Sequence, residues 1–291
     1  MIKNIIRKII PHSIKVMHGK YRLYWLQRGI IKYLRNTSEF EKFEETEIIN
    51  YLRNNLLSVF PYNFTKKYNA ADIIVYTDSN NMKYVLHENK KLYFKKKWDE
   101  NKIKSCYNRL LIEQDIDSPH RYQTADFCVN EGNIVVDAGA AEGNFALSIV
   151  EKVTKLYLFE VDEEWVEALK VTFEPWKEKV EIICKYVSNN DEGNCITLDA
   201  VFWEKKIDFI KADIEGAEIA LLKGCKNILS DTEKLKVVMC TYHKQDDAEN
   251  IDQLLTKAKF NTEFSKGYML FLYDTLLAPP YLRRGLIRAI K

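Results

Sequence analysis

The first residues that could do chemistry form a glycine turn after the apolar run at 133–138. Asp137 stands just before Gly139, and Gly143 follows with Ala141 between the two glycines. Glycine lets the backbone bend sharply and approach a ligand closely, and amides at a helix start can meet the ligand's polar groups. The spacing is GxxxG, so the GxGxxG fingerprint of a dinucleotide phosphate site is missing. Asp137 would repel a pyrophosphate and attract an ammonium or sulfonium group.

A second acid, Glu160, ends the next β-prone run. An acid at the tip of the second strand of an α/β sheet can accept hydrogen bonds from both hydroxyls of a ribose. The alternative is a glutamate that only faces solvent. Tyr122 and His120 stand just upstream of the first run and could cover a bound cofactor, although loop histidines are more often plain surface residues.

Further along the chain, acids and a histidine follow two more β-prone runs. Asp213 and Glu215 follow the run at 207–212, and His243 follows the run at 236–241. A histidine, with a usual pKa of about 6.5, can take a proton from an alcohol near neutrality. Asp213 could orient this imidazole or act as the base itself, and a purely structural His243 is the alternative. Asp213 and Glu215 could instead bind a divalent cation, but we predict a site without a metal.

Four segments of the chain together resemble the FkbM family of S-adenosylmethionine-dependent methyltransferases: DAGAAEGNF, FEVD, TLD and IDFIKADIEGAEIALLKG. The resemblance covers roughly residues 118 to 273, and the pattern KxDxEGxE at 211–218 is its most specific part. It implies a class I methyltransferase fold with S-adenosylmethionine as cofactor. It also implies O-methylation of a hydroxyl on a glycan, glycolipid or natural product.

The resemblance assigns roles to individual residues. It implies that the turn from 137 to 143 lies at the methionine part of the cofactor, that Glu160 holds the ribose and that Val187 borders the adenine. Many family members have an acid or a Tyr-His pair after the fifth strand, which implies that His243 faces the sulfonium. Ala141 departs from the family, which commonly has asparagine there, so one side-chain contact to the cofactor is missing.

Alternating strands and helices after residue 130 would position these residues. Strands are expected at 133–138, 155–161, 180–184, 207–213 and 236–241, and helices at 143–152, 163–173, 216–229 and 246–258. This alternation predicts an α/β fold with a mostly parallel, Rossmann-like sheet that binds ligands at its carboxyl edge. The runs at 260–264 and 267–273 predict a terminal antiparallel hairpin, which by analogy separates methyltransferase sheets from dehydrogenase sheets.

The region 1–115 has a different pattern, and we expect the S-adenosylmethionine-binding methyltransferase domain to span 116–291. Helical patterns reach residue 59, β-hairpin runs lie between 72 and 96, and a helix is expected at 100–114. Nine Lys or Arg residues precede the first acid, Glu39, and isoleucines form one face of a basic helix at 2–10. Such a helix could lie on an anionic membrane, or pack on this protein or on a second copy as a homodimer contact.

Composition sets broad limits on the kind of protein. A hydrophobic content of 46%, a charged content of 30% and a net charge of +2 are ordinary for a soluble globular protein. The six cysteines form no CxxC pair, which disfavours a disulfide framework or a structural zinc site. No apolar run approaches the roughly 18 residues of a spanning helix. We expect a cytoplasmic protein, peripheral at the inner face of a membrane if the basic helix binds lipid.

Two other functions compete with the methyltransferase prediction. A nicotinamide-dependent dehydrogenase also uses a glycine turn and a ribose-binding acid, but the missing GxGxxG and Asp137 disfavour it. A non-catalytic binding module on the same fold is the other, and Ala141 is the one hint in its favour. Nucleic acid is not the expected substrate, because Asp213-Ile-Glu215-Gly216 replaces the Asn/Asp-Pro-Pro-aromatic loop of amino-methylating enzymes.

Overall fold

The computed structural model describes residues 12–38, 40–203, 205–272 and 277–291, and its contacts divide the chain into two compact units. The larger unit consists of Phe64–Gly267 and Arg283–Lys291, and the smaller of the residues up to Asn63 and Tyr268–Leu282. Residues 64–115 thus fall in the larger unit, whereas the sequence pattern grouped them with the N-terminal region. The isoleucine face expected at 2–10 lies outside the described residues.

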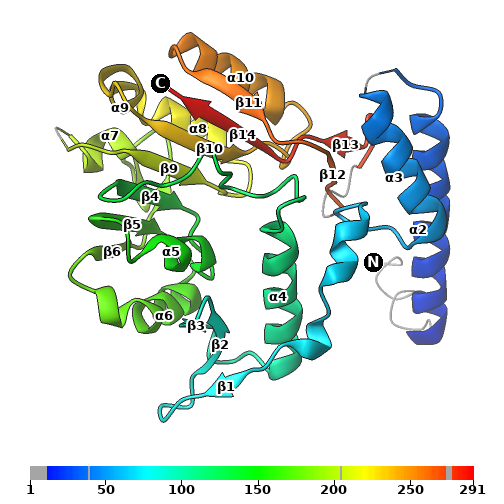
Figure 1. The fold of residues 1–291 in the computed structure, drawn as a ribbon, viewed down its shortest axis with the longest axis horizontal. Helices are drawn as coiled ribbons and strands as arrows, with labels where there is room; N and C mark the ends of the chain where they lie inside the picture. The colour runs from blue at the N-terminus through cyan, green and yellow to red at the C-terminus, as the bar shows by residue number, and fades with distance from the viewer. Residues whose placement is uncertain (1–11, 39, 204, 273–276) are drawn as a thin grey trace, which may run out of the picture. The chain divides into compact units, whose positions relative to one another are not determined.

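A seven-stranded sheet forms the centre of the larger unit (Figure 1). The five strands from β10 to β6 are parallel, and β14 runs antiparallel to both of its neighbours. The predicted α/β fold, with a mostly parallel sheet and an antiparallel end, is therefore confirmed. In spatial order the strands are β11 (Asn261–Phe264), β14 (Leu286–Ile290), β10 (Lys236–Cys240), β9 (Phe209–Ala212), β4 (Ile134–Ala138), β5 (Lys155–Phe159) and β6 (Val180–Ile183).

Helices connect the parallel strands, which read as continuous apolar runs because such strands are buried on both faces. Where one helix was expected at 216–229, the structure has two. Gly224 separates them. A side chain has no room at this position, since a Cβ would lie 2.0 Å from the carbonyl oxygen of Ser188. The connecting helices are α5 (Asn144–Ile149), α6 (Glu163–Thr172), α7 (Leu198–Val201), α8 (Glu218–Lys223), α9 (Lys226–Asp231) and α10 (Asp247–Lys257).

The predicted terminal hairpin is wrong in its second strand. β11 forms as expected, but it pairs with β14, in a register that sets Phe264 opposite Ile287. Among residues 267–272, the part of the expected run at 267–273 that the structure describes, only Met269–Leu270 is a strand, β12, and it lies outside the seven-stranded sheet. The run at 267–273 is more apolar than β14, which contains Arg288. The Arg288 guanidinium donates to main-chain oxygens of the loop before β4, which makes its burial tolerable.

The remaining elements surround this sheet or belong to the smaller unit. In the smaller unit, α2 (His12–Leu34) packs on α3 (Lys42–Asn54). No helix of the described chain combines the length and apolar character needed to cross a membrane. The other elements are η1 (Asn63–Lys67), η2 (Ala70–Asp72), β1 (Tyr76–Thr77), β2 (Lys83–His87), β3 (Lys90–Tyr93), α4 (Glu100–Glu113), η3 (Glu174–Trp176), β7 (Tyr186–Val187), β8 (Cys195–Ile196) and β13 (Leu282–Arg283).

Candidate active site

The carboxyl edge of the parallel strands gathers the residues with chemical potential. Glu160 directly follows β5, Asp213 directly follows β9, and His243 stands three residues after the end of β10. Since parallel strands end at the same edge, residues far apart in the chain meet there. Asp213 and His243 are in contact, with 3.5 Å between Asp213 Oδ1 and His243 Nε2.

Asp137 lies within β4, fully buried, and is paired inside the protein. Its Oδ1 is 2.9 Å from Nζ of Lys211 on the neighbouring strand, and the same Nζ donates to the carbonyl oxygen of Gly139 at 2.7 Å. Burial raises the pKa of Asp137, while Lys211 opposes that rise. Asp137 was expected to attract a cationic ligand, but Lys211 already neutralises its carboxylate. The pair joins β4 to β9 and holds the start of the turn.

The two glycines of the turn are required by the protein's own packing. Both have left-handed backbone conformations, with φ of 75° at Gly139 and 79° at Gly143. A Cβ on Gly139 would lie 1.9 Å from the carbonyl oxygen of Asp213, and one on Gly143 would lie 2.6 Å from Cδ2 of Leu169. The turn therefore packs closely against the tip of β9 and against α6, and these contacts fix its shape.

Glu160 holds the turn from the side of β5. Its Oε2 accepts a hydrogen bond from the Ala141 N–H at 2.9 Å, and its Oε1 accepts from the N–H groups of Val161 and Asp162 at 2.7 and 2.8 Å. An ionised carboxylate has about four acceptor positions, so three are used here. Glu160 is half-buried and retains acceptor capacity for one more donor.

Ala141 adopts a left-handed conformation with φ of 45°, which asparagine and glycine tolerate better than alanine. We expect Ala141→Gly to raise the free energy of unfolding by about 0.5–1 kcal/mol, after allowing for the greater entropy of an unfolded glycine. Ala141→Asn should change stability in the same direction. Urea unfolding followed by circular dichroism measures the effect.

The matched control for this prediction is Ala146→Gly, the same exchange in the buried middle of α5. There the backbone is helical, so the exchange should lower stability by about 1 kcal/mol. Equal losses at both positions would show that the Ala141 conformation carries no strain.

Asp213 lies at the centre of the polar residues at this edge and contacts several of them. Its Oδ2 accepts from the Tyr122 hydroxyl at 2.8 Å, and its Oδ1 accepts from the Tyr242 hydroxyl at 3.3 Å. Burial alone would raise the pKa of Asp213, but the neighbouring histidines, above all His120, and the Lys211 ammonium hold it well below its usual range. Asp213 is therefore an ionised carboxylate in a largely buried network, and Tyr122 is anchored on it.

His120 joins the same network from a loop far away in sequence. Its Nε2 lies 3.1 Å from the Tyr242 hydroxyl and 3.6 Å from Asp213 Oδ2. Burial lowers the pKa of His120 to about 4, so the imidazole is neutral at physiological pH. The sequence placed His120 only near the first strand, and the contact with Tyr242, 122 residues away, appears only in the structure.

His243 is oriented by an acid to which the sequence analysis gave no role. Its Nδ1 lies 3.1 Å from Oε1 of Glu218, which is fully buried in the first turn of α8. The Glu218 Oε1 also accepts from the Ile214 N–H at 3.0 Å, which fixes the carboxylate. With Nδ1 directed at Glu218, the other nitrogen, Nε2, faces Asp213 at 3.5 Å and Glu215 Oε2 at 3.8 Å. Glu218 was part of the KxDxEGxE pattern, so the signal was present.

The charge environment of His243 favours its protonated form. Burial alone would lower its pKa, but Glu218 and then Asp213 outweigh burial, and the pKa is raised above its usual value. Glu215 is 90% exposed on its side chain and has a left-handed φ of 55°. Asp213 and His243 thus form the inner part of the cluster, and Glu215 lies at its solvent side.

Two groups of side chains in the described part of the chain have the spacing to hold a metal ion. One is Asp213, Glu218 and His243, and the other is His120, Asp213 and Cys240. In the first group, Glu218 meets His243 through Nδ1, so these atoms also make up the acid–imidazole pair described above. Glu215, which would be the second ligand beside Asp213 in the alternative reading with a divalent cation, is in neither group.

Val187 is a core residue in the structure. It is buried in the hydrophobic cluster that includes Leu198 and Phe202. The residues that follow it become accessible, and Asn189 and Asn190 are exposed. Val187 was expected to border the adenine, but its side chain packs into this core. The adjoining loop carries the accessible polar atoms.

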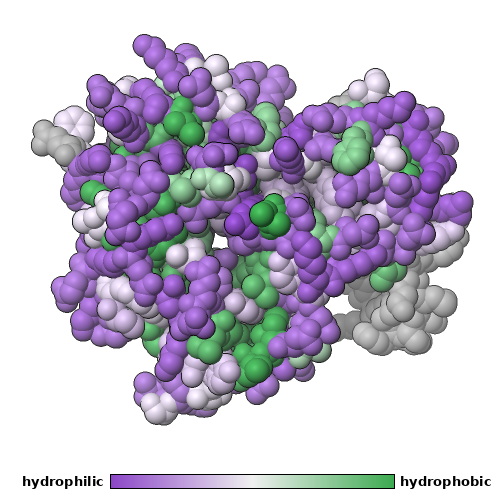
Figure 2. Space-filling model, viewed as in Figure 1, coloured by the Kyte–Doolittle hydropathy of each residue, from purple (hydrophilic) through white to green (hydrophobic). Residues whose placement is uncertain are grey.

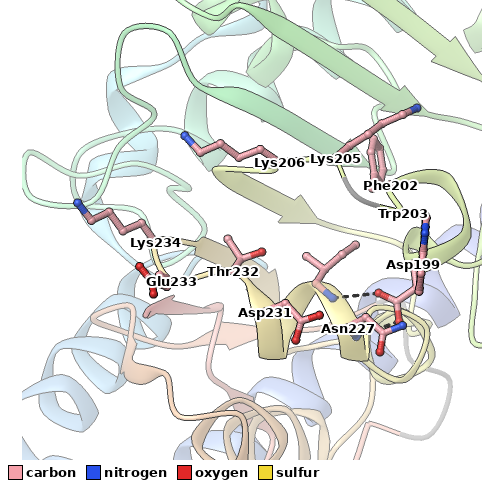
Figure 3. A pocket seen from close by; sticks show the side chains of 11 residues that line it. Asp199, Phe202, Trp203, Lys205, Lys206, Asn227, Asp231, Thr232, Glu233 and Lys234 are labelled. Carbon is pink, nitrogen blue, oxygen red and sulfur yellow. Dashed lines mark hydrogen bonds between the residues drawn. The ribbon is translucent and has the colours of Figure 1, made fainter.

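One cavity among the described residues lies away from this edge (Figure 3). It has a volume of about 510 Å³ and is lined by the segments 199–206 and 227–234. Lys206 precedes β9 and Lys234 precedes β10, so the cavity opens at the amino ends of these strands. Figure 3 shows Asp199 directed at the start of α9, where it accepts from the N–H groups of Asn227 and Ile228. No predicted site residue lines this cavity.

Comparison with known proteins shows similarity to one family over part of the chain. Residues 186–262 match the model of the methyltransferase FkbM domain. No curated protein sequence matches the chain. Among solved structures, a methyltransferase FkbM from Methylobacillus flagellatus is similar at 14% identity and a TM-score of 0.47. The match covers 66% of this chain and 53% of that one, so this chain corresponds to about half of that protein's length.

Two other solved structures are similar to part of the chain, with lower TM-scores. An rRNA methylase from Streptococcus thermophilus is 18% identical with a TM-score of 0.36, and the match covers 56% of this chain and 89% of that chain. A structure from Streptococcus mutans in complex with SAH is 15% identical with a TM-score of 0.36, covering 56% and 90%.

Proposed function

We propose that this chain, whose residues 186–262 match the methyltransferase FkbM domain, transfers a methyl group from S-adenosylmethionine to a hydroxyl of a glycan, glycolipid or natural product. The observation that carries this proposal is the pairing of His243 with the buried Glu218, beside the ionised Asp213. The acceptor is a small molecule or glycan, and nucleic acid has no part in the proposal.

The charge of the carboxyl edge fits S-adenosylmethionine. Burial, followed by the nearby carboxylates of Asp213 and Glu142, raises the pKa of Glu113, at the end of α4, to about 8. Such crowding of carboxyl groups favours a cationic ligand. Glu160 adds acceptor capacity for a ribose hydroxyl, and Tyr122 borders the same space through its bond to Asp213. Asp137 supports the glycine turn through its ion pair with Lys211. Val187 and the loop that follows it are assigned to the adenine of the cofactor.

In the proposed reaction, His243 acts as the general base. When bound, the cofactor supplies an electrophilic methyl group on a sulfonium. The Glu218 carboxylate holds the proton of Nδ1, so that Nε2 presents a lone pair to the acceptor hydroxyl. As the acceptor oxygen gained the methyl group and the S–CH3 bond broke to leave the neutral thioether, the hydroxyl proton would pass to Nε2, and Asp213 would stabilise the resulting imidazolium. Positioning provides much of the rate enhancement, and the fixed Glu218 carboxylate contributes to it. Glu215, at the solvent side, is assigned to contact with the acceptor.

The experiment that tests the proposal is calorimetric titration of S-adenosylmethionine into the wild-type chain and into Glu160→Ala. We expect binding by the wild type and at least about tenfold weaker binding by the variant, because a ribose hydrogen bond to a carboxylate and the support of the turn are both lost. NAD is titrated in parallel and should give no heat.

Glu163→Ala is the matched control, since Glu163 is an exposed acid three residues away on α6. It should bind the cofactor as the wild type does. Wild-type affinity in Glu160→Ala would remove Glu160 from the site, and tight binding of NAD in place of S-adenosylmethionine would favour the dehydrogenase alternative.

A further inference from the structure

One face of α2, in the smaller unit, carries a row of basic residues with aromatic neighbours. Tyr24, Arg28, Lys32 and Arg35 follow one another at the i, i+4, i+8 and i+11 spacing of a single helix face. All four are exposed. Trp25 adjoins this row, with 53% of its surface exposed. We call these five residues the basic face of α2.

The opposite side of α2 fixes this orientation. Ile30 and Leu34 are fully buried, as are Ile48 and Leu52 of α3, on which α2 packs. The helix cannot turn its basic face inward without exposing this apolar contact. In Figure 2 the side chains over α3 and the visible part of α2 are mostly hydrophilic.

The basic face has a single sign of charge. Among residues 12–38 of the structure there is no Asp or Glu, and the sequence reaches its first acid only at Glu39. The acids of this unit then gather on α3, whose first turn holds Glu44 and Glu45. A row of cations without intervening acids is attracted to a surface of negative charge.

The aromatic residues indicate which kind of negatively charged surface the basic face fits. Tyr24 is 50% exposed, and the Arg28 guanidinium lies 5.5 Å from the centre of the Tyr24 ring. Tyrosine and tryptophan are enriched at the boundary between lipid headgroups and acyl chains, where arginine and lysine meet phosphates. A nucleic acid would also attract the cations, but it offers no apolar layer for Tyr24 and Trp25. We propose that the basic face of α2 docks the protein on membranes that contain anionic phospholipid.

The test is flotation of the full chain with vesicles of phosphatidylcholine alone and of phosphatidylcholine mixed with phosphatidylglycerol. We expect binding to the mixed vesicles and little to the neutral ones. The variant Arg28→Gln with Lys32→Gln and Arg35→Gln should bind the mixed vesicles about tenfold more weakly or worse, since each basic residue near an anionic surface contributes to the attraction. Raising the salt concentration should release the wild type, because the attraction is screened.

The matched control removes three charges elsewhere. Lys170, Lys223 and Lys257 are exposed on helices of the larger unit, and changing all three to Gln alters the net charge equally. This control should float as the wild type does. Trp25→Phe should remove the blue shift of tryptophan fluorescence that vesicle binding produces.

Three outcomes would overturn the proposal. One is equal flotation of the wild type and the α2 variant. Another is a preference of the wild type for a DNA or RNA oligonucleotide over anionic vesicles at the same salt concentration. The third is a halving of the solution mass in the α2 variant without vesicles, which would identify the face as a contact between two copies of the chain.

Discussion

Replacing His243 by glutamine is expected to lower the turnover number about a hundredfold or more, with S-adenosylmethionine affinity close to that of the wild type. Glutamine keeps polar atoms of similar reach but cannot accept a proton near neutral pH. The imidazole also has Nε2 directed at Asp213, at 3.5 Å, and not at the glycine turn. Turnover by methyl transfer and cofactor affinity by calorimetry are measured on the same preparation, which separates a chemical role from a binding role.

The pH dependence of turnover tests the base more sharply. A base must be neutral to act, so the rate should rise with pH through the pKa of His243, which lies above the usual value of about 6.5. Glu218→Gln removes the charge that raises this pKa, so the inflection should move to lower pH as turnover falls. A structural role for Glu218 would lower the rate at every pH without moving the inflection. Loss of cofactor affinity with normal turnover in the His243 variant would contradict the base role.

Replacing Lys211 by methionine is expected to lower the free energy of unfolding by about 3–5 kcal/mol, because it leaves a buried carboxylate without its partner. Asp137 is fully buried, and Lys211 Nζ at 2.9 Å is its countercharge. The loss should be smaller in acid. Without Lys211 the pKa of Asp137 in the folded protein rises further above its unfolded value, so folding takes up a proton and stability falls as pH increases. Urea unfolding at acidic and neutral pH measures both effects.

Two further variants separate the ion pair from the general effect of removing a lysine. Lys170→Met changes an exposed lysine on α6 and should alter stability by less than about 0.5 kcal/mol. The double variant with Asp137→Leu and Lys211→Met should recover part of the loss, since replacing both buried charges by apolar groups is often tolerated. If Lys211→Met were as stable as wild type at neutral pH, Asp137 would have to be compensated by another group.

Local patterns in the sequence were sufficient for the central sheet. The runs that became β4, β5, β9 and β10 are mostly apolar, because parallel strands are shielded on both faces, and each is followed by a helical period. The glycine turn was also recognised, although for a different reason. The structure shows that Gly139 and Gly143 make room for Asp213 and Leu169, which periodicity cannot reveal.

The contacts at the site depend on sequence distances that no local pattern encodes. Tyr122 meets Asp213 across 91 residues, and His120 meets Tyr242 across 122. The sequence places Glu218 in a predicted helix, but its partner His243 lies in the loop after β10. β14 was missed because a more apolar run stood nearer to β11, and because the carbonyls that satisfy Arg288 belong to residues 121 and 122.

The pairing of Phe264 with Ile287 has a consequence for how this protein could change over time. The main chain leaves β11 and re-enters β14 at directly facing positions, so for the sheet the whole excursion through 265–286 is equivalent to a hairpin loop. A turn of a few residues would close the same pair of strands. Residues 268–282 of the smaller unit are in this sense an insertion between two paired strands, and their sequence can change without altering the register of β11 and β14.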